Sequence, residues 1–226
     1  MNILVIAAHP DDEVLGAGAS ISRWIDEGCK VHIAILGEGA TSRSQLREPE
    51  GHAAVATLQR RANDAAQRLG APPPRMLGFA DNRFDTLPLL EIVQHVERLI
   101  VEFEPDLVLT HHGGDLNIDH ALTFRAVLTA LRPIEGMRVR ELRTFEIASS
   151  TEWSFSRFEP AFRPNCFVDV SATLQRKLDA MSCYDSEARA FPHPRSPLAL
   201  ESLARTRGAQ AGFAAAEAFE TVWRRE

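Results

Sequence analysis

The chain opens with an uninterrupted apolar run, ILVIAA at residues 3–8, which ends abruptly in the polar sequence HPDDE at residues 9–13. A short continuous apolar run is typical of a strand that is buried on both faces of a parallel sheet. Pro10 suits the first turn of a helix, and helical spacing of apolar residues continues from there to Gly28. A buried strand that leads directly into a helix favours an α/β fold.

The alternation of strands and helices continues along the first half of the chain. Further strands are expected at 31–37, 75–79 and 106–112, and further helices at 52–69, 87–105 and 121–133. Strands that alternate with helices are joined by right-handed crossovers. This pattern predicts a mostly parallel sheet with helices on both faces.

The sequence after about residue 139 has a less regular pattern. It predicts strands at 142–148 and 165–170, helices at 172–190 and 198–220, and a loop at 191–197. We interpret this part as a smaller C-terminal α+β extension. Because no linker, internal repeat or low-complexity segment interrupts the chain, we expect a single domain over residues 1–226.

Composition argues against several classes of protein. A formal net charge of −6 and the lack of a basic stripe oppose a nucleic-acid partner. No apolar run reaches the roughly 18 residues of a membrane span, and the first residues lack the basic start of a signal peptide. The three cysteines form no CxxC pair. We expect a cytoplasmic protein that does not insert into a membrane. The sequence leaves open whether the protein forms a homo-oligomer.

A second polar loop follows the strand predicted at 106–112, with the sequence HHGGDLNIDH at residues 111–120. Ligands of open α/β sheets bind beyond the carboxyl ends of the strands. The loops at 9–13 and 111–120 are therefore expected to converge on one crevice. No GxGxxG follows the first strand, so the dinucleotide-binding fingerprint is absent.

The two loops together contain the residues of a catalytic metal site. His9 and Asp12, three residues apart across a strand-to-helix turn, can direct a nitrogen and a carboxylate oxygen toward one point, and His120 can supply a third ligand. Two histidines and one carboxylate with open positions suit Zn²⁺ or Fe²⁺. Asp11 adjoins Asp12 but points elsewhere, which makes it a candidate general base for a metal-bound water.

Other interpretations of these residues are open at this stage. Acidic residues in the first turn of a helix also stabilise its positive end, and an isolated histidine such as His120 is often structural. The same ligand set serves oxygen chemistry at ferrous iron, although those sites usually lie in jelly-roll barrels. A non-catalytic module that binds carbohydrate or nucleotide is a further alternative.

The motifs of this chain resemble those of the PIG-L/LmbE-like de-N-acetylases: AHPDDEVLGAG, GEGATSR, FADNRFD, THHGGDLNIDH and RGAQAGFAAAEAFE. The resemblance implies a Rossmann-like fold and a divalent metal, usually zinc, for hydrolysis of an acetamide on an amino sugar. It implies His9, Asp12 and His120 as the metal ligands and Asp11 as the general base. It also implies that Asp119 supports one of the histidines.

One position departs from the family pattern. Many members have a histidine three residues before the last ligand, and this chain has Asn117 there. An amide can donate a hydrogen bond to an oxyanion, but it cannot act as a general acid near neutral pH. The acid is then Asp11 after protonation, or another histidine. Our candidate is His193, in the proline-bracketed sequence FPHPRSP, although it can equally be an ordinary loop residue.

Candidate substrate-binding residues follow the second and third predicted strands. Arg43, Asp81 and Arg83 can bind sugar hydroxyls, although aspartate is also an ordinary turn residue. Arg195 and Arg207 can bind a phosphate, which would favour a nucleotide-linked or lipid-linked N-acetyl sugar. We expect the partner to be a small N-acetylated sugar or its conjugate.

Overall fold

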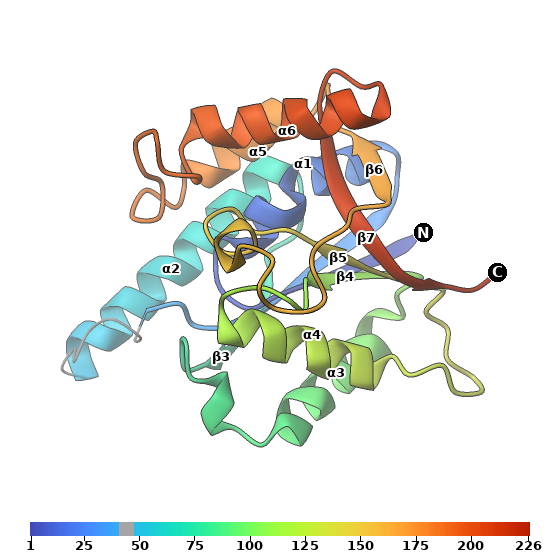
Figure 1. Ribbon diagram of the computed structural model, residues 1–226. Helices are drawn as coiled ribbons and strands as arrows, with labels where there is room; N and C mark the ends of the chain where they lie inside the picture. The colour runs from blue at the N-terminus through green and yellow to red at the C-terminus, as the bar shows by residue number, and fades with distance from the viewer. Residues whose placement is uncertain (41–47) are drawn as a thin grey trace.

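The computed structural model describes residues 1–40 and 48–226, with side chains described for 1–40 and 53–226. Within these residues, seven strands form one sheet in the order β3-β2-β1-β4-β5-β7-β6 (Figure 1). The parallel strands are β1 (Asn2–Ala7), β2 (Lys30–Gly37), β3 (Arg75–Phe79), β4 (Leu107–His111) and β5 (Glu141–Phe145). Strand β7 (Ala216–Arg224) runs antiparallel to both of its neighbours, β5 and β6 (Cys166–Asp169).

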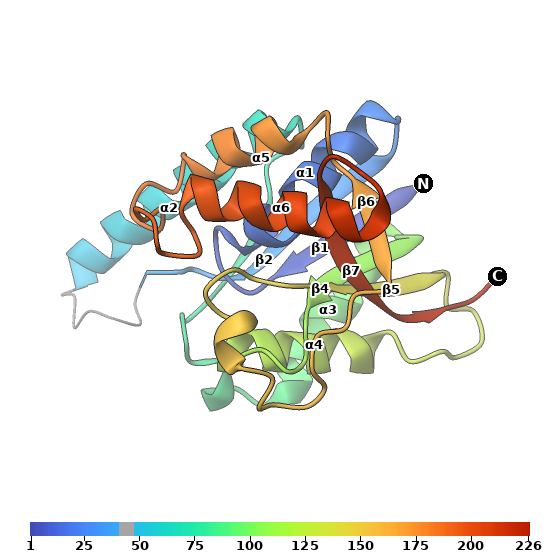
Figure 2. The ribbon, with the colours of Figure 1, turned by 45° about the horizontal axis from the view of Figure 1, so that its top comes forward.

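Helices cover both faces of the sheet (Figures 1 and 2). One face carries α1 (Asp12–Asp26), α2 (Glu48–Leu69), α5 (Leu174–Met181) and α6 (Pro197–Ala211), and the other carries α3 (Leu89–Phe103) and α4 (Ile118–Ala130). Two 3-10 helices, η1 (Phe84–Thr86) and η2 (Glu152–Ser154), lie in loops. No helix of the described residues is long and apolar enough to cross a membrane.

The buried strand β1 explains the apolar run at the start of the sequence. Its side chains alternate between two hydrophobic cores, with Ile3 and Val5 in one and Leu4 and Ile6 in the other. Both sets are shielded from water, so the strand has no polar face. The predicted α/β class, with a mostly parallel sheet and helices on both faces, is confirmed.

The strand order brings the two polar loops together. Strand β1 pairs with β2 on one side and with β4 on the other, and the chain crosses between these sides by way of α3. The carboxyl ends of β1 and β4 therefore adjoin at the switch point of the sheet. A hydrogen bond from the Ala8 N–H to His111 Nε2, 2.8 Å long, joins them directly.

The prediction of a helix over 198–220 is wrong in its second part. Helix α6 ends at Ala211, and Gly212 follows in the left-handed conformation (φ 78°) that commonly ends a helix. Residues 216–224 then form β7, whose first four residues are buried where it lies between β5 and β6. The alanines of this segment favour a helix, but the open position in the sheet determines a strand.

The prediction of a helix over 172–190 is also too long. Helix α5 ends at Met181, and residues 182–196 form turns without a regular helix before α6 begins. Several of these residues line the cavity at the carboxyl edge of the sheet, as described below.

Helix α1 packs closely on the sheet because it has glycine at position 16. A Cβ at Gly16 would lie 2.4 Å from Cδ2 of Phe145, which is fully buried in β5. The Phe145 ring in turn contacts His111 edge-on, with ring centroids 4.9 Å apart. The close approach therefore links α1 to the strand end that carries the second polar loop.

We expect Gly16→Ala to lower the free energy of unfolding by about 1–3 kcal/mol because the new methyl group overlaps Phe145. Gly18→Ala is the matched control, since its Cβ would lie 3.3 Å from Lys177 Cγ and from Val14 Cγ1, contacts that require a shift of only a few tenths of an ångström. For this control we expect a change within about 1 kcal/mol. Urea denaturation measures both, and equal stability of the two variants would contradict the interpretation.

Candidate metal centre

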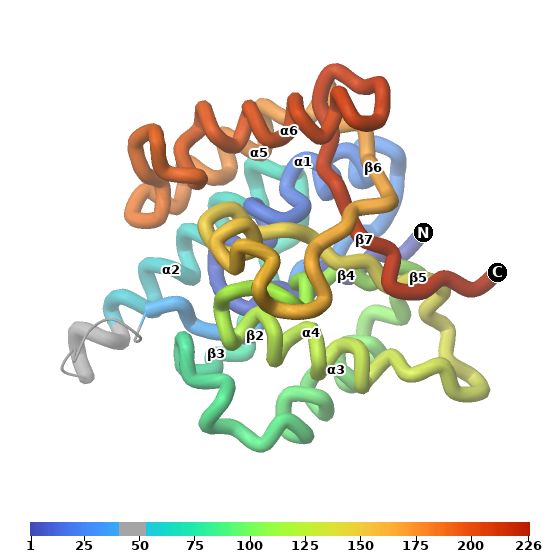
Figure 3. The backbone as a smooth tube through the Cα atoms, in the orientation of Figure 1, coloured from blue at the N-terminus to red at the C-terminus, as the bar shows by residue number. Residues whose placement is uncertain are grey.

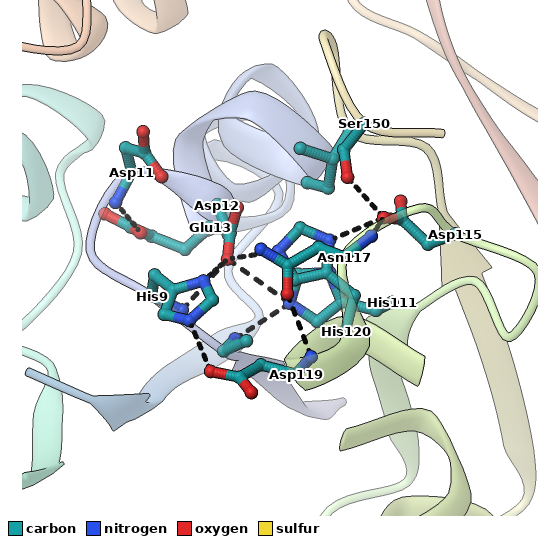
Figure 4. A network of polar contacts seen from close by, with 12 residues as sticks. His9, Asp11, Asp12, Glu13, His111, Asp115, Asn117, Asp119, His120 and Ser150 are labelled. Carbon is teal, nitrogen blue, oxygen red and sulfur yellow. Dashed lines mark hydrogen bonds and ion pairs between the residues drawn. The ribbon is translucent and has the colours of Figure 1, made fainter. Parts of the chain in front are cut away.

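His9, Asp12 and His120 meet at the carboxyl edge of the sheet (Figure 4). His9 follows β1, Asp12 is the first residue of α1, and His120 lies in the first turn of α4. Asp12 Oδ2 is 3.4 Å from His9 Nδ1 and 3.2 Å from His120 Nε2. One potential ligand atom from each residue lies within 4.8 Å of the others, and all three residues are buried.

The remaining nitrogen of each histidine is held by a carboxylate. His9 Nε2 lies 2.9 Å from Asp119 Oδ2, while Asp119 Oδ1 accepts a hydrogen bond from the Phe84 N–H. His120 Nδ1 lies 3.0 Å from Asp115 Oδ1. In metal sites, a carboxylate behind a histidine fixes the orientation of the ring and strengthens it as a ligand. Asp119 thus lies behind His9, on the side of the ring away from Asp12, and the supporting role stays a prediction.

The electrostatics of this cluster favour a cation. Burial by itself lowers the pKa of His9, but hydrogen bonds to Asp119 and Asp12 raise it to about 10. Burial also opposes the charged form of His120, yet the charge of Asp12 and a hydrogen bond to Asp115 help to raise its pKa to about 9. The nearby carboxylates therefore stabilise positive charge at this point. Two imidazoles and a carboxylate are a donor set that fits a divalent metal such as Zn²⁺ or Fe²⁺.

Asp11 lies beside this cluster with its carboxylate in contact with Arg195. Its Oδ2 is 2.6 Å from Arg195 Nη1, and Arg195 Nε donates to Ser149 Oγ at 2.8 Å. Burial raises the pKa of Asp11 well above its ordinary value, and the positive charge of Arg195 offsets only part of this rise. The guanidinium predicted to bind a substrate phosphate is therefore paired with a carboxylate of the chain itself.

Asn117 and His193, the other two predicted catalytic residues, both line the same cavity. Asn117 is the N-cap of α4: its Oδ1 accepts from the Asp119 N–H at 2.8 Å, and its Nδ2 donates to Asn82 Oδ1 at 3.1 Å. The His193 ring lies edge-on to Trp153, with ring centroids 5.5 Å apart.

The predicted substrate-binding residues are placed differently from one another. Asp81 lines the cavity and is buried, with Oδ1 3.1 Å from His9 Nε2. Arg83 is exposed and is not among the described residues that line the cavity, and Arg43 lies outside the described residues. Arg207 donates to both carboxylate oxygens of Glu146, at 2.7 and 2.6 Å, and does not line this cavity.

The cavity above the cluster has a volume of about 510 Å³. Its lining comes from the two polar loops, from residues 39–40, Leu58 and residues 81–82, and from the segments 149–153 and 187–195. A cavity of this volume is in the range of small-molecule sites, and most of its lining residues are polar. The segments from the C-terminal part thus complete a site that begins at the first strand.

Comparison with known proteins identifies the family of this chain. A family model described as PIG-L: GlcNAc-PI de-N-acetylase matches residues 4–131. The chain belongs to the PIG-L family. It is similar to the probable N-acetyl-alpha-D-glucosaminyl L-malate deacetylase 2 of Bacillus cereus, with 27% identity over 199 residues, covering 84% of this chain and 85% of the relative.

Two solved structures share this fold over nearly the whole chain. The N,N'-diacetylchitobiose deacetylase of Pyrococcus horikoshii has a TM-score of 0.77 and 20% identity, covering 97% of this chain and 83% of that chain. GalB, the 4-carboxy-2-hydroxymuconate hydratase of Pseudomonas putida, has a TM-score of 0.77 and 22% identity, covering 100% and 98%. A deacetylase and a hydratase therefore share this fold, so the fold alone does not determine the reaction.

Sequence reasoning missed two buried residues that support His120. The ring of His111 stacks on that of His120, with centroids 4.0 Å apart. Asp115 accepts hydrogen bonds from Ser150 Oγ and, at 2.7 Å, from Thr151 Oγ1, which anchors the β5–β6 loop where it passes the start of α4 (Figure 3). Their place in the second polar loop was visible in the sequence, but their partners were not.

We expect Asp119→Asn to weaken Zn²⁺ binding by about 10- to 100-fold, because it removes the negative charge behind His9. Asp106→Asn is a suitable control, since the Asp106 carboxylate binds the Asn2 N–H at the opposite end of β1. Titration against a chromophoric chelator gives both affinities. Unchanged zinc affinity in Asp119→Asn would show that His9 is not a ligand held in this way.

Proposed function

We propose that this protein is a metal-dependent hydrolase that removes the N-acetyl group from an amino sugar or its conjugate. The observation that carries this proposal is the buried group of His9, Asp12 and His120 at the base of a cavity that the carboxylate of Asp11 also lines. Membership of the PIG-L family, and relatives named as sugar deacetylases, support the substrate class.

His9, Asp12 and His120 would hold the ion, for which zinc is our first choice and Fe²⁺ the alternative. When bound there, such an ion acts as a Lewis acid and lowers the pKa of a coordinated water. Asp119 and Asp115 keep the two imidazole rings oriented for this purpose through the nitrogens that face away from Asp12.

Asp11 is our candidate for the proton transfers. The oxygen of a water adds to the acetamide carbonyl carbon while the Asp11 carboxylate takes a proton from that water. Asp11 then returns the proton to the sugar nitrogen as the C–N bond breaks, which yields acetate and a free amine. Burial raises the pKa of Asp11, which makes its carboxylate a stronger proton acceptor, and the Arg195 contact offsets part of that rise.

Asn117 and His193 take supporting roles in this proposal. The side-chain amide of Asn117 has two N–H donors, of which one is used by Asn82. We assign the other to the oxyanion that develops on the acetamide oxygen. His193 lines the cavity and is the second candidate for the acid that protonates the leaving amine.

The alternatives raised by the sequence are less well supported. Oxygen chemistry at iron usually uses a jelly-roll barrel, whereas this sheet is mostly parallel and covered by helices. A binding module has no need for a proton acceptor beside the candidate metal ligands, whereas the Asp11 carboxylate lies next to them and lines the cavity. The position of Asp11 therefore favours catalysis.

A panel of N-acetylated sugars tests the proposal. Zinc-loaded protein is incubated with N-acetylglucosamine, diacetylchitobiose, N-acetylglucosaminyl malate and a nucleotide-linked N-acetyl sugar, and primary amine and acetate are measured. We expect equal amounts of amine and acetate from at least one compound, with loss of activity after chelation and recovery with Zn²⁺. If none releases amine while an unsaturated carboxylic acid is hydrated, the protein is a hydratase instead.

We expect Asp11→Asn to lower kcat by about 10²- to 10⁴-fold, because the amide cannot accept the proton. Zinc affinity should stay within about threefold of wild type, since Asp11 is not one of the three ligands. The control is Asp85→Asn, at an exposed position that does not line the cavity. Substantial activity in Asp11→Asn would rule out this residue as the general base.

A further inference from the structure

Asp11 occupies the N-cap position of α1 but does not cap the helix. An aspartate at an N-cap normally has extended backbone angles, and its carboxylate accepts N–H groups of the first turn. Asp11 instead has φ 112° and ψ −29°, in the left-handed region, and its side chain makes no capping hydrogen bond. The unusual backbone leaves the carboxylate free to line the cavity and to contact Arg195.

A left-handed conformation is unfavourable for a residue with a side chain, and it persists only where the surroundings hold it. Here the Asp11 N–H donates to Glu13 Oε2 at 3.0 Å, a contact visible in Figure 4. The other carboxylate oxygen of Glu13 accepts a hydrogen bond of 2.6 Å from the hydroxyl of Tyr184. Glu13 is 1% exposed and Tyr184 0%, so no water competes for these bonds.

Tyr184 is the only tyrosine of the chain and comes from a distant part of the sequence. Tyr184 lies in the turns that follow α5, and its carbonyl accepts hydrogen bonds from the N–H groups of Glu187 and Ala188. The same segment continues to Arg195, which contacts the Asp11 carboxylate. Residues 184–195 therefore hold Asp11 at two points, its backbone N–H through Glu13 and its carboxylate directly.

We propose that Glu13 and Tyr184 are positioning residues that hold Asp11 in the left-handed conformation and so direct its carboxylate into the cavity. This inference rests on the proposed role of Asp11 in proton transfer. It assigns Glu13 a task separate from that of its neighbour Asp12, and it gives the buried hydroxyl of Tyr184 a function in the reaction.

The metal ligands are held by other contacts. Asp12 Oδ2 accepts from the His9 N–H at 2.9 Å and faces the two imidazoles, and none of these contacts includes Tyr184. Loss of the Tyr184 hydroxyl should therefore disturb Asp11 and leave the metal site in place. A lower kcat with unchanged metal affinity would therefore distinguish positioning from a general loss of structure.

The first test compares Tyr184→Phe with Ser22→Ala in the zinc-loaded protein. Ser22 lies in α1, as Glu13 does, and its buried hydroxyl donates to the Leu69 carbonyl at 3.1 Å, away from the cavity. We expect Tyr184→Phe to lower kcat by about 10- to 100-fold, with KM and zinc Kd within about threefold of wild type. Ser22→Ala should keep kcat within about twofold. Equal losses of kcat in both variants, or wild-type kcat in Tyr184→Phe, would overturn the proposal.

A second measurement does not depend on activity. Hydrogen exchange of the Asp11 amide, followed by NMR, should be slow in wild type and in Ser22→Ala and faster in Tyr184→Phe. Glu13→Ala should accelerate this exchange more than Glu13→Gln, whose amide oxygen can still accept from Asp11. If the wild type releases no amine from any sugar, the proposed function fails and the amide exchange alone decides the inference. Exchange at Asp11 that is unchanged in Tyr184→Phe and both Glu13 variants would overturn it.

Discussion

Asp12 and the two histidines that face it place buried charge at the carboxyl end of β1, and much of the surrounding structure compensates for that charge. Ionised groups out of water are unfavourable unless they are paired and hydrogen-bonded. Each histidine accordingly has a carboxylate behind it, Asp119 for His9 and Asp115 for His120. These carboxylates are fixed in turn by the backbone of η1 and by the hydroxyls of the β5–β6 loop. The hydrogen bonds of the site therefore extend into the loops that enclose it.

The C-terminal part of the chain completes the lining of the cavity although it contributes none of the three candidate ligands. Strand β7 inserts between β5 and β6 and extends the sheet beyond its parallel half. Between α5 and α6, the segment with Tyr184 and Arg195 reaches back to Asp11. The parallel half alone brings the three candidate ligands together, whereas the added segments supply the contacts to Asp11, the residue we assign to proton transfer.

Some features could be predicted because they are local. The apolar run of β1, the helix that follows it and the pair His9–Asp12 depend on residues that are close in sequence, where spacing controls direction. His120 could be added because loops at the carboxyl ends of parallel strands share one edge of the sheet. The strand at 216–224 could not be predicted, because its alanines favour a helix and its place in the sheet depends on β5 and β6.

The sequence by itself determined the α/β class, the two polar loops and the candidate ligands, because periodicity and motif spacing act over short stretches of chain. Only the tertiary structure decided which distant groups hold those residues. Tyr184 meets Glu13 across 171 positions and Arg195 meets Asp11 across 184. Arg195 and Arg207 looked alike in the sequence, yet one contacts Asp11 and the other pairs with Glu146 away from the cavity. Packing of the whole chain selects such contacts, and no local pattern encodes them.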